Sequence, residues 1–336
     1  MQQRGRIKVV IVDSAFEDAS VENMILKEIN ADVQFFHCKD EEEIVRIAKE
    51  ANAIINNLLP MSKETISALD KLQLIVRCAV GYDNIDLKAA TENKVVICNV
   101  PDYCTAEVAD HTLGLILSLS RKIPWIDSYT KKGRADFSAD WKNFAPIYRL
   151  NGKTAGIIGF GKIGREVAKR LKAFGLRILV YDPYLPQKIF ENFGVAPVAL
   201  EDLLKTSDIV SIHCPLTKDT YHLISKDKLG LMKKTAILVN VSRGPIVDEE
   251  ALYEALKNNL IQSAALDVFE KEPLEKNSPF LKLKNVIITP HIAWYSEEAA
   301  IDSRKFASEE ILRFFKGVKP KNIVNLEVLK YYPQLE

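Results

Sequence analysis

The stretch Lys153-Thr-Ala-Gly-Ile-Ile-Gly159-Phe-Gly161-Lys-Ile-Gly164 decides the fold of this chain. It reads as a buried strand that enters a glycine turn and then a helix, the order that binds the pyrophosphate of a dinucleotide. Gly159 permits the tight turn, Gly161 lets the backbone approach the phosphates, and Gly164 lets the helix pack closely on the strand. The free N–H groups at the start of the helix then face the phosphates.

A second apolar run, Arg177-Ile-Leu-Val-Tyr181, ends on Asp182. The Asp182 carboxylate is placed to accept hydrogen bonds from both ribose hydroxyls and would repel the additional phosphate of NADP. A glycine turn that only packs a helix on a strand is the alternative, because the glycine motif alone is a weak signal. Strand, glycines, helix, strand and acid in this order predict a Rossmann sheet that binds NAD.

The composition is that of an ordinary globular protein. The 336 residues are 47% apolar and 27% charged, and this length favours two domains. With 46 basic and 45 acidic residues the net charge is +1, so no overall field attracts the chain to nucleic acid or to an anionic membrane. The composition therefore predicts neither a nucleic-acid partner nor a membrane partner.

The cysteines and the N-terminus predict a cytoplasmic location. The five cysteines are odd in number and form no C-x-x-C pair, which favours buried thiols in a reducing compartment over a disulfide framework or a metal site. The apolar run Ile7–Val12 is too short for the core of a signal peptide, and no apolar run reaches the length that spans a membrane.

Strands and helices alternate in both halves of the chain, which predicts parallel α/β sheets. In the first hundred residues the strand-like runs are Lys8–Val12, Val33–Phe36, Ala53–Asn56, Leu72–Val76 and Val95–Cys98, with helical patterns such as Ser20–Ile29 and Glu41–Glu50 between them. From Lys153 onward, six runs at 154–158, 177–181, 208–212, 235–239, 263–266 and 285–288 match the two halves of a Rossmann sheet.

Two further segments connect these halves. Thr105–Leu119 has the pattern of a helix, and Ser296–Phe315 reads as one long helix. The segment Pro124–Leu150 has no clear periodicity and is predicted to be a crossover between domains.

Five of the six strands of the second half are closely followed by a polar residue, namely Asp182, His213, Ser242, Asp267 or His291. Ligands of open α/β sheets bind at the carboxyl ends of the strands, so these residues face the expected ligand crevice. Arg243, after the fourth strand, can hold a carboxylate in two-pronged fashion, although a solvated loop arginine is the alternative.

His291 is a candidate proton donor to a carbonyl oxygen, and its alternative is a structural histidine at a strand end. Glu272 is the candidate carboxylate that orients His291 and sets its tautomer. Glu270 and Glu275 are competitors for that role, so the residues alone suggest this set of groups without requiring it.

Several ordered motifs resemble the D-isomer-specific 2-hydroxyacid dehydrogenases over nearly the whole chain. The motifs are Gly156–Gly164, Ser211-Ile-His-Cys-Pro-Leu-Thr217, Met232–Gly244, Ala265-Leu-Asp-Val-Phe269 with Glu272-Pro273, Thr289-Pro-His291, and Ala79-Val-Gly81-Tyr-Asp-Asn-Ile-Asp86, which is similar to the substrate loop of the family. The resemblance implies that Arg243 binds the substrate carboxylate and carbonyl, that His291 is the general acid/base, and that Glu272 orients it. It also implies that the N–H groups of Val80 and Gly81 hold the carboxylate.

The resemblance further implies the domain organisation. A flavodoxin-like substrate domain would comprise residues 1–99 and 292–336, and the Rossmann domain residues 100–291, with a dimerisation helix and crossover at 102–150. The active site would lie between the domains of a homodimer. Cofactor contacts are implied at Thr105, Gly159, Gly161, Lys162, Ile163, Gly164, Asp182, Cys214, Pro215, Val241, Ser242, Asp267 and Ala293.

One departure from the family concerns the residues after the histidine. Many members have a glycine-rich turn there, whereas this chain has Ile292-Ala-Trp294-Tyr-Ser-Glu297. Together with Arg77, this looks most similar to the branch of the C-terminal-binding-protein corepressors and the phosphoglycerate dehydrogenases. Arg77 and Trp294 are therefore added to the expected substrate contacts, with aromatic packing at a domain junction as the alternative for Trp294.

The sequence thus predicts an enzyme that uses NAD to interconvert a 2-keto acid and a D-2-hydroxy acid. The substrate stays open among glyoxylate, hydroxypyruvate, phosphohydroxypyruvate and larger keto acids. Because the chain ends soon after residue 325, the long type of phosphoglycerate dehydrogenase is not expected. Formate dehydrogenases that resemble the family carry glutamine in place of Glu272, which argues against that reaction. The alternative from another class is an NAD-sensing dimeric module with little turnover.

Overall fold

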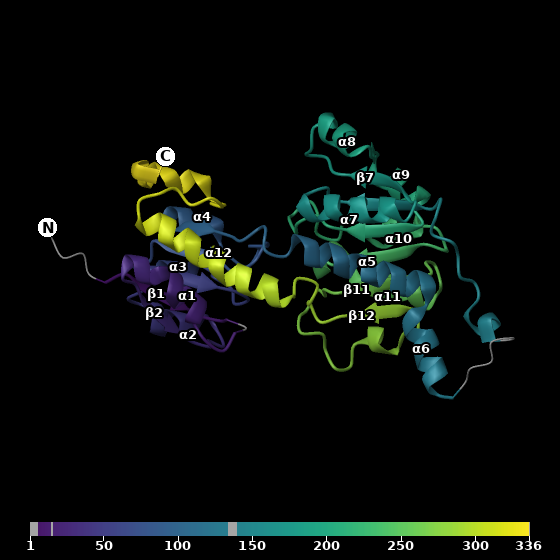
Figure 1. The fold of residues 1–336 in the computed structure, drawn as a ribbon, viewed down its shortest axis with the longest axis horizontal. Helices are drawn as coiled ribbons and strands as arrows, with labels where there is room; N and C mark the ends of the chain where they lie inside the picture. The colour runs from purple at the N-terminus through teal and green to yellow at the C-terminus, as the bar shows by residue number, and fades with distance from the viewer. Residues whose placement is uncertain (1–5, 15, 134–139, 336) are drawn as a thin grey trace. The chain divides into compact units, whose positions relative to one another are not determined.

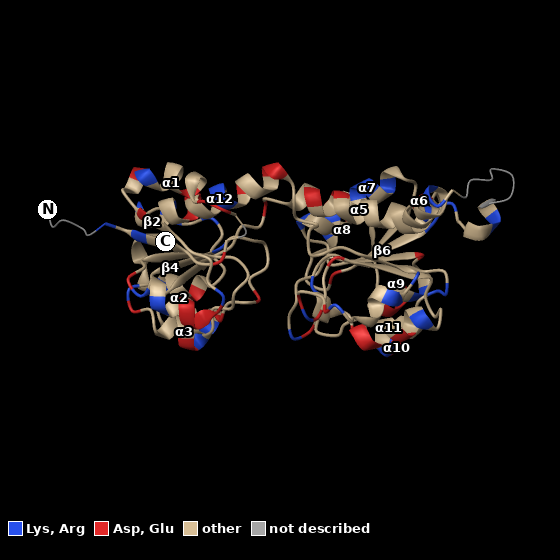
Figure 2. Ribbon diagram, turned by 90° about the horizontal axis from the view of Figure 1, so that it is seen from below, with Lys and Arg blue, Asp and Glu red and all other residues tan. Residues whose placement is uncertain are grey.

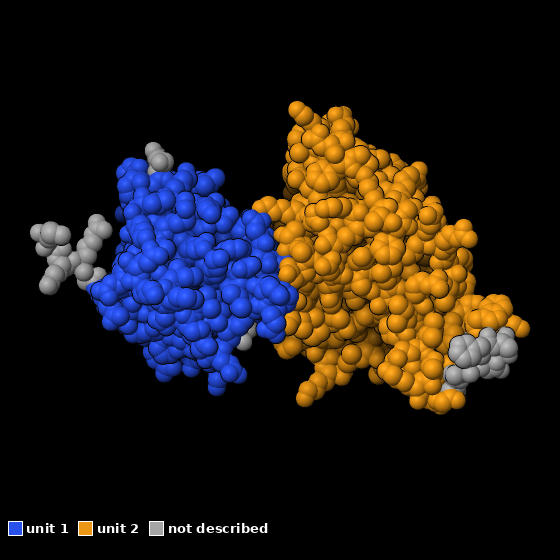
Figure 3. Space-filling model, in the orientation of Figure 1, with its two compact units in different colours: residues 1–104, 296–336 blue, residues 105–295 orange. Residues whose placement is uncertain are grey.

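The computed structural model describes residues 6–14, 16–133 and 140–335. The chain divides into two compact units, residues 1–104 with 296–336 and residues 105–295, which Figure 3 shows in different colours. These boundaries lie a few residues beyond the expected ones at 99 and 291. One cause is that the segment after Asn99 stays with the first unit, where Val100 N–H donates to the carbonyl of Ala79 over 3.0 Å.

Unit 1 contains a five-stranded parallel sheet in the order β2-β1-β3-β4-β5. This is the flavodoxin-like order, and it confirms the fold predicted for this part of the chain. The strands are β1 (Lys8–Ile11), β2 (Asp32–Phe35), β3 (Ala53–Asn56), β4 (Leu74–Arg77) and β5 (Val96–Cys98), and the crossover helices are α1 (Ser20–Leu26), α2 (Glu41–Ala48), α3 (Lys63–Ser67) and α4 (Leu87–Glu92) (Figure 1).

The strands of unit 1 are continuous apolar runs because helices cover both faces of a parallel sheet. Every residue of β3, β4 and β5 is buried, including Arg77 at the end of β4. Val10, Ile54 and Ile75 belong to one core cluster on one side of this sheet.

The C-terminal segment returns to complete unit 1. Helix α12 (Glu297–Phe315) packs on α1, and its buried Arg304 donates to Glu22, which is also buried, over 2.6 and 2.8 Å. Further along, Asn325 accepts from Ile97 N–H at 2.8 Å and donates to the carbonyl of Val95 at 2.9 Å. Removing one partner of such a buried ion pair typically costs about 3–5 kcal/mol, so Arg304 fixes α12 to the start of the chain.

Unit 2 contains a seven-stranded parallel sheet in the order β12-β11-β10-β9-β6-β7-β8. Its strands are β6 (Thr154–Ile158), β7 (Arg177–Tyr181), β8 (Ala196–Pro197), β9 (Ile209–Ile212), β10 (Ile237–Asn240), β11 (Ser263–Leu266) and β12 (Val286–Ile288). The predicted Rossmann sheet is confirmed, but the expected number of six strands was wrong. The missed strand β8 is a short exposed edge strand that contains a proline, so it has no apolar run to reveal it.

Helices flank this sheet and connect its strands (Figure 1). They are α5 (Thr105–Arg121), α7 (Lys162–Ala173), α8 (Gln187–Phe193), α9 (Leu200–Thr206), α10 (Lys226–Gly230) and α11 (Glu249–Lys257). Helix α5 packs against α7 and contacts β10 and β11, which places it beside the strands that carry the candidate site.

The expectation of an aperiodic crossover after Pro124 was wrong for its first part. Residues Ile123–Lys131 form helix α6, with Pro124 in its first turn, and a 3₁₀ turn follows at Asp140–Phe144. Helix α6 has no buried residue, and without a buried face its sequence lacks the regular apolar stripe by which a helix is predicted. Residues 134–139 of the expected crossover lie outside the described residues.

Basic and acidic residues are interspersed over the helices of both units, consistent with the net charge of +1 (Figure 2). None of the helices in the described part of the chain combines the length and the apolar character that crossing a membrane requires.

Candidate active site

The candidate site lies at the carboxyl ends of the strands of unit 2. Strands β7 and β9 flank β6, so the direction in which strands are added reverses at β6, and ligands bind at such a switch point. The loop of Gly159 leaves β6 at this point. The loops after β10, β11 and β12 leave the same edge and carry Arg243, Glu272 and His291.

The three glycines of the motif meet different constraints. Gly159 has a φ of +88°, and a Cβ there would lie 2.4 Å from the backbone nitrogen of Cys214. A Cβ on Gly164 would lie 2.3 Å from the carbonyl oxygen of Gly159, so helix α7 packs directly on the turn. A Cβ on Gly161 would have no neighbour within 4 Å, which leaves open space next to the N-terminus of α7, where Lys162 and Ile163 begin the helix. These features fit a dinucleotide pyrophosphate.

Asp182 follows β7 and holds the glycine turn. Its carboxylate accepts hydrogen bonds from Phe160 N–H at 2.8 Å and Tyr184 N–H at 3.1 Å. A carboxylate has about four acceptor positions, so these two bonds leave capacity for the hydroxyls of a ribose. The geometry therefore suits the cofactor role that the sequence assigns to Asp182.

The other expected cofactor residues of unit 2 lie on this edge or on α5. Ser242 Oγ donates to the carbonyl of Cys214 at 2.5 Å, which joins the loops after β9 and β10 beside Pro215 and Val241. Burial raises the pKa of the Cys214 thiol to about 12, so this thiol stays neutral and is not a nucleophile. Thr105 begins α5, and Ala293 is buried in the turn after His291.

His291 and Glu272 form a close pair. Nδ1 of His291 lies 2.6 Å from Oε2 of Glu272, and the other carboxylate oxygen accepts from Phe269 N–H at 2.9 Å. Both side chains are about one third exposed, at 38% and 34%. The pairing fixes the tautomer with hydrogen on Nδ1 and leaves Nε2 without a hydrogen-bond partner among the described residues, so Nε2 is available for proton transfer.

The pKa of Glu272 is set by opposing effects. Burial raises it, but the hydrogen bond and charge of His291, the Phe269 N–H and the charge of Arg243 together hold the pKa below its usual value. Glu272 therefore stays ionised at neutral pH and offers a negative charge beside the His291 ring.

The two competing glutamates have other partners. Glu270 lies 2.8 Å from Nε2 of His222 and accepts from Glu249 N–H, while Glu275 pairs with Lys271. Only one of the three glutamates is thus in contact with His291 in the part of the chain that the structure describes.

Arg243 lies on the loop adjoining the pair. Its backbone is extended, with a φ of −142°, and it precedes a 3₁₀ turn at Gly244–Ile246. A Cβ on Gly244 would lie 1.8 Å from the carbonyl carbon of Phe269, so the loops after β10 and β11 touch through their backbones. This contact requires glycine, and it brings the Arg243 charge close enough to act on Glu272.

The turn that carries His291 is held by Asp267, whose side chain is 1% exposed. The Asp267 carboxylate accepts from the Thr289 hydroxyl at 2.6 Å, Ile292 N–H at 3.0 Å and Ala293 N–H at 2.9 Å. His291 itself has a φ of +54°, a left-handed conformation that is rare outside glycine. Sequence reasoning gave Asp267 only a cofactor role and missed Thr289, because neither spacing nor composition shows which side chain closes a turn.

His213, immediately after β9, has a buried ring nitrogen, Nδ1. Its ring donates to or accepts from Ser211 Oγ at 2.8 Å through Nε2, and burial lowers its pKa to about 3. The ring is therefore neutral at any physiological pH.

The expected substrate residues of the first half belong to unit 1. Val80 and Gly81 lie on the loop after β4, where Asn99 donates to the carbonyl of Val80 at 2.7 Å. The buried Arg77 donates to Asn57 Oδ1 at 2.8 Å and to Asn84 Oδ1 at 3.1 Å. Arg77 thus ties two loops of its own unit together, which is a structural task that the sequence did not predict.

Trp294 belongs to unit 2, where it is half-buried and packs edge-to-face on Tyr295 with ring centroids 5.5 Å apart.

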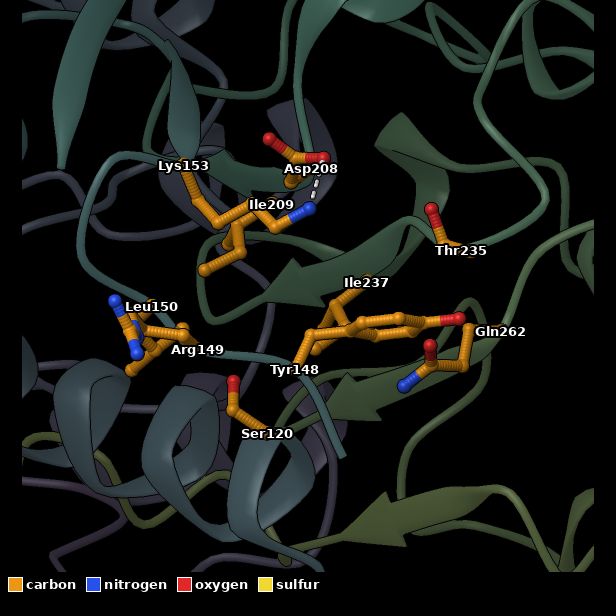
Figure 4. Close-up of a pocket in the computed structure, with 10 residues that line it drawn as sticks. All are labelled: Ser120, Tyr148, Arg149, Leu150, Lys153, Asp208, Ile209, Thr235, Ile237 and Gln262. Carbon is orange, nitrogen blue, oxygen red and sulfur yellow. Dashed lines mark hydrogen bonds and ion pairs between the residues drawn. The ribbon is translucent and has the colours of Figure 1, made fainter. Parts of the chain in front are cut away.

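A small pocket in unit 2 lies away from all of these groups (Figure 4). Its lining includes Lys153, Asp208 and Gln262, which immediately precede β6, β9 and β11. The pocket is therefore at the amino ends of the strands, the edge of the sheet opposite to the candidate site. Lys153 and Asp208 pair there over 3.5 Å.

Comparisons with known proteins agree with this geometry. Residues 113–293 match the family model described as the NAD-binding domain of the D-isomer specific 2-hydroxyacid dehydrogenases. The chain is 41% identical to a glyoxylate reductase of Korarchaeum cryptofilum over 86% of this chain and 87% of that protein. It is also 41% identical to a D-3-phosphoglycerate dehydrogenase of Methanocaldococcus jannaschii, over 95% of this chain but only 60% of the relative.

A solved structure extends the similarity to the whole fold. The D-lactate dehydrogenase of Aquifex aeolicus, complexed with NAD and lactic acid, superposes with a TM-score of 0.81 at 30% identity, covering 96% of this chain and 98% of that one. The sequence similarity, the topology of the sheets and the position of the candidate site at the carboxyl edge of the second sheet all agree. The chain therefore belongs to the D-isomer specific 2-hydroxyacid dehydrogenase family and is an NAD-dependent oxidoreductase.

Proposed function

We propose that Arg243, Glu272 and His291 are the catalytic groups of this dehydrogenase, and that it interconverts a 2-keto acid and a D-2-hydroxy acid. The observation that carries the proposal is the 2.6 Å contact between His291 Nδ1 and Glu272. Glu272 lies on the loop after β11, and the backbone of this loop touches the loop that carries Arg243. A titratable ring oriented by an ionised carboxylate next to a guanidinium suits a substrate that carries a carboxylate beside a carbonyl.

NAD, when bound, supplies or accepts the hydride. In the reducing direction, Arg243 binds the substrate carboxylate and orients the carbonyl, and His291 donates a proton from Nε2 to the carbonyl oxygen. Glu272 keeps the ring oriented through Nδ1 and stabilises its positive charge before the transfer. In the oxidising direction neutral His291 takes the hydroxyl proton, so the two directions need opposite protonation states of one ring.

The cofactor would be held by the residues of the glycine turn, by Asp182, and by the loops that carry Cys214-Pro215, Val241-Ser242, Asp267 and Ala293. Thr105, at the start of α5, completes the set that the resemblance implies. The negative charge of Asp182 supports a preference for NAD over NADP, because a 2′-phosphate would be repelled.

Unit 1 is proposed as the substrate-binding domain. The loop of Val80 and Gly81 offers backbone N–H groups for the substrate carboxylate, and Arg77 supports this loop through Asn84. Trp294 is proposed to contact the substituent of the keto acid.

A small keto acid of the glyoxylate or hydroxypyruvate type is the proposed substrate class. The similarity to the glyoxylate reductase, which covers 87% of that protein, supports this choice. The similarity to the phosphoglycerate dehydrogenase leaves a phosphorylated substrate as the second candidate.

A homodimer formed through α5, α6 and the following crossover is also proposed. Helix α6 has no buried residue, and Ile123, Trp141 and Tyr148 are 52%, 64% and 44% exposed in this part of the chain. Apolar side chains of this size on one connected segment favour an interface between subunits.

All five cysteines are free thiols, which supports the proposed cytoplasmic location.

The proposed reaction is tested with a panel of keto acids in the presence of NADH. We expect steady oxidation of NADH with glyoxylate or hydroxypyruvate, and the D-hydroxy acid from every keto acid that gives a chiral product. Absorbance of NADH and chiral chromatography measure the two quantities. Absence of turnover with the whole panel would favour the alternative of an NAD-sensing module, and an L-product would contradict the proposed stereochemistry.

Cofactor preference follows from Asp182. NADH should be preferred to NADPH by a wide margin in kcat/KM, and Asp182→Ala should narrow that margin because the repulsive charge is removed. The ratio of the two kcat/KM values is the measurement. Equal efficiency with both cofactors in the unmodified enzyme would show that Asp182 does not select the cofactor.

The carboxylate clamp and the proton donor should differ in their kinetics. Arg243→Ala should raise KM sharply and lower kcat, and Arg243→Lys should recover only part of the loss, since an ammonium lacks the two-pronged contact. His291→Ala should chiefly lower kcat, by roughly a hundredfold or more. NADH binding, followed by fluorescence, should change little in either variant. Normal kinetics in Arg243→Ala would mean that another group holds the carboxylate.

The pH dependence tests the pair of Glu272 and His291. Because the pKa of Glu272 is lowered, Glu272 stays charged from neutral pH down to mildly acidic pH, while the two directions of the reaction need opposite protonation states of the His291 ring. Reduction should therefore weaken as pH rises, and oxidation should strengthen. Glu272→Gln should move both profiles to lower pH, since an amide stabilises an imidazolium less than a carboxylate does. Glu270→Gln is the matched control, and its profiles should stay in place.

A further inference from the structure

His111 on helix α5 contacts the turn of the catalytic histidine. Its Nε2 lies 3.1 Å from Thr289 Oγ1 and 3.7 Å from Asp267 Oδ1. The side chain is 25% exposed, so most of it is enclosed between α5 and the sheet. None of the functions proposed above uses His111.

The hydrogen-bond pattern defines the direction of this contact. The Thr289 hydroxyl has one hydrogen, and it donates that hydrogen to the Asp267 carboxylate at 2.6 Å. Thr289 Oγ1 can then only accept from His111, so Nε2 of His111 must carry a hydrogen. The result is a directed chain from His111 through Thr289 to Asp267.

Asp267 uses the same carboxylate to hold the turn after His291. It accepts from Ile292 and Ala293 N–H, and its backbone carbonyl accepts from His291 N–H at 2.7 Å. The left-handed backbone of His291 is rare outside glycine, and such a conformation persists only where the surroundings determine it fully. The orientation of Asp267 is therefore part of what holds His291 in place.

We infer that His111 is a positioning residue for His291. By donating to Thr289, it fixes the hydroxyl on Asp267, and Asp267 in turn holds the backbone from which the His291 ring reaches Glu272. The inference rests on the proposed acid/base role of His291. It assigns to α5 a task beyond the proposed dimer interface, which is to hold the turn that carries the acid/base.

Paired substitutions test this chain of contacts. His111→Phe removes the donor but keeps a ring, and we expect kcat to fall roughly tenfold or more with a small change in KM, as a misplaced group can cost up to about a hundredfold. His111→Gln restores an N–H donor and should recover most of the loss. Thr289→Val removes the hydroxyl and Thr289→Ser keeps it, so we expect the first variant to lower kcat and the second to retain most of the activity. Asp110→Asn, at an exposed neighbour on α5, should leave activity unchanged.

Combining variants shows whether His111 acts through His291. In the His291→Ala background, His111→Phe should cause no further loss of kcat, because the group that it positions is absent. An equal loss in both backgrounds, or no recovery in His111→Gln and Thr289→Ser, would overturn the inference. If His111→Phe does not fold, the same comparison is made with Thr289→Val and Thr289→Ser, each with and without His291→Ala. Full activity of His291→Ala alone would instead contradict the proposed function.

Discussion

Close backbone contacts at the carboxyl edge of the second sheet are the constraint on which the rest of the structure depends. A side chain on Gly159 would collide with Cys214, one on Gly164 with the carbonyl of Gly159, and one on Gly244 with Phe269. Loops that leave neighbouring strands can meet at these distances only where a Cβ is missing. The glycine turn that suits a pyrophosphate and the loops that bring Arg243 near Glu272 therefore follow from the same condition.

Carboxylates at strand ends hold the loops that these contacts bring together. Asp182 accepts from Phe160 and Tyr184 N–H, and Asp267 accepts from Ile292 and Ala293 N–H. In unit 1, Asp13 after β1 accepts from three successive N–H groups, of Asn57, Leu58 and Leu59, on the loop after β3. Each acid satisfies backbone groups that would otherwise lack partners, so each loop has a defined shape before any ligand binds.

This arrangement gives the charged groups different tasks. Asp182 and Asp267 accept many of their hydrogen bonds from backbone N–H groups. Glu272, by contrast, accepts from Phe269 N–H with one carboxylate oxygen and contacts the His291 ring with the other. Glu272 is thus fixed in position and still able to stabilise charge on the ring. The proposed acid/base, held in this way, loses little entropy in reaching the reactive orientation, which is the general advantage of preorganised sites.

Much of the fold was predictable from the sequence. Continuous apolar runs separated by helical patterns predict parallel sheets, because strands covered on both faces must be apolar throughout. The order of glycines, helix and acid predicted the dinucleotide site, since each residue answers a local backbone requirement. Strand β8 and helix α6 were not predicted, because neither has a buried face that would require a regular spacing of apolar residues in its sequence.

The candidate site shows which contacts a local sequence pattern can predict and which it cannot. The sequence by itself determined that Arg243, Glu272 and His291 follow strands of one sheet, and hence that they share an edge. The family resemblance already pointed to Glu272 rather than Glu270 or Glu275, but only the tertiary structure showed that Glu272 contacts His291 and that Arg77 ties Asn57 to Asn84. It alone placed His111 of α5 against Thr289, some 178 residues away in the chain. Contacts between distant segments depend on how helices pack on the sheet, and no local spacing in the sequence encodes that packing.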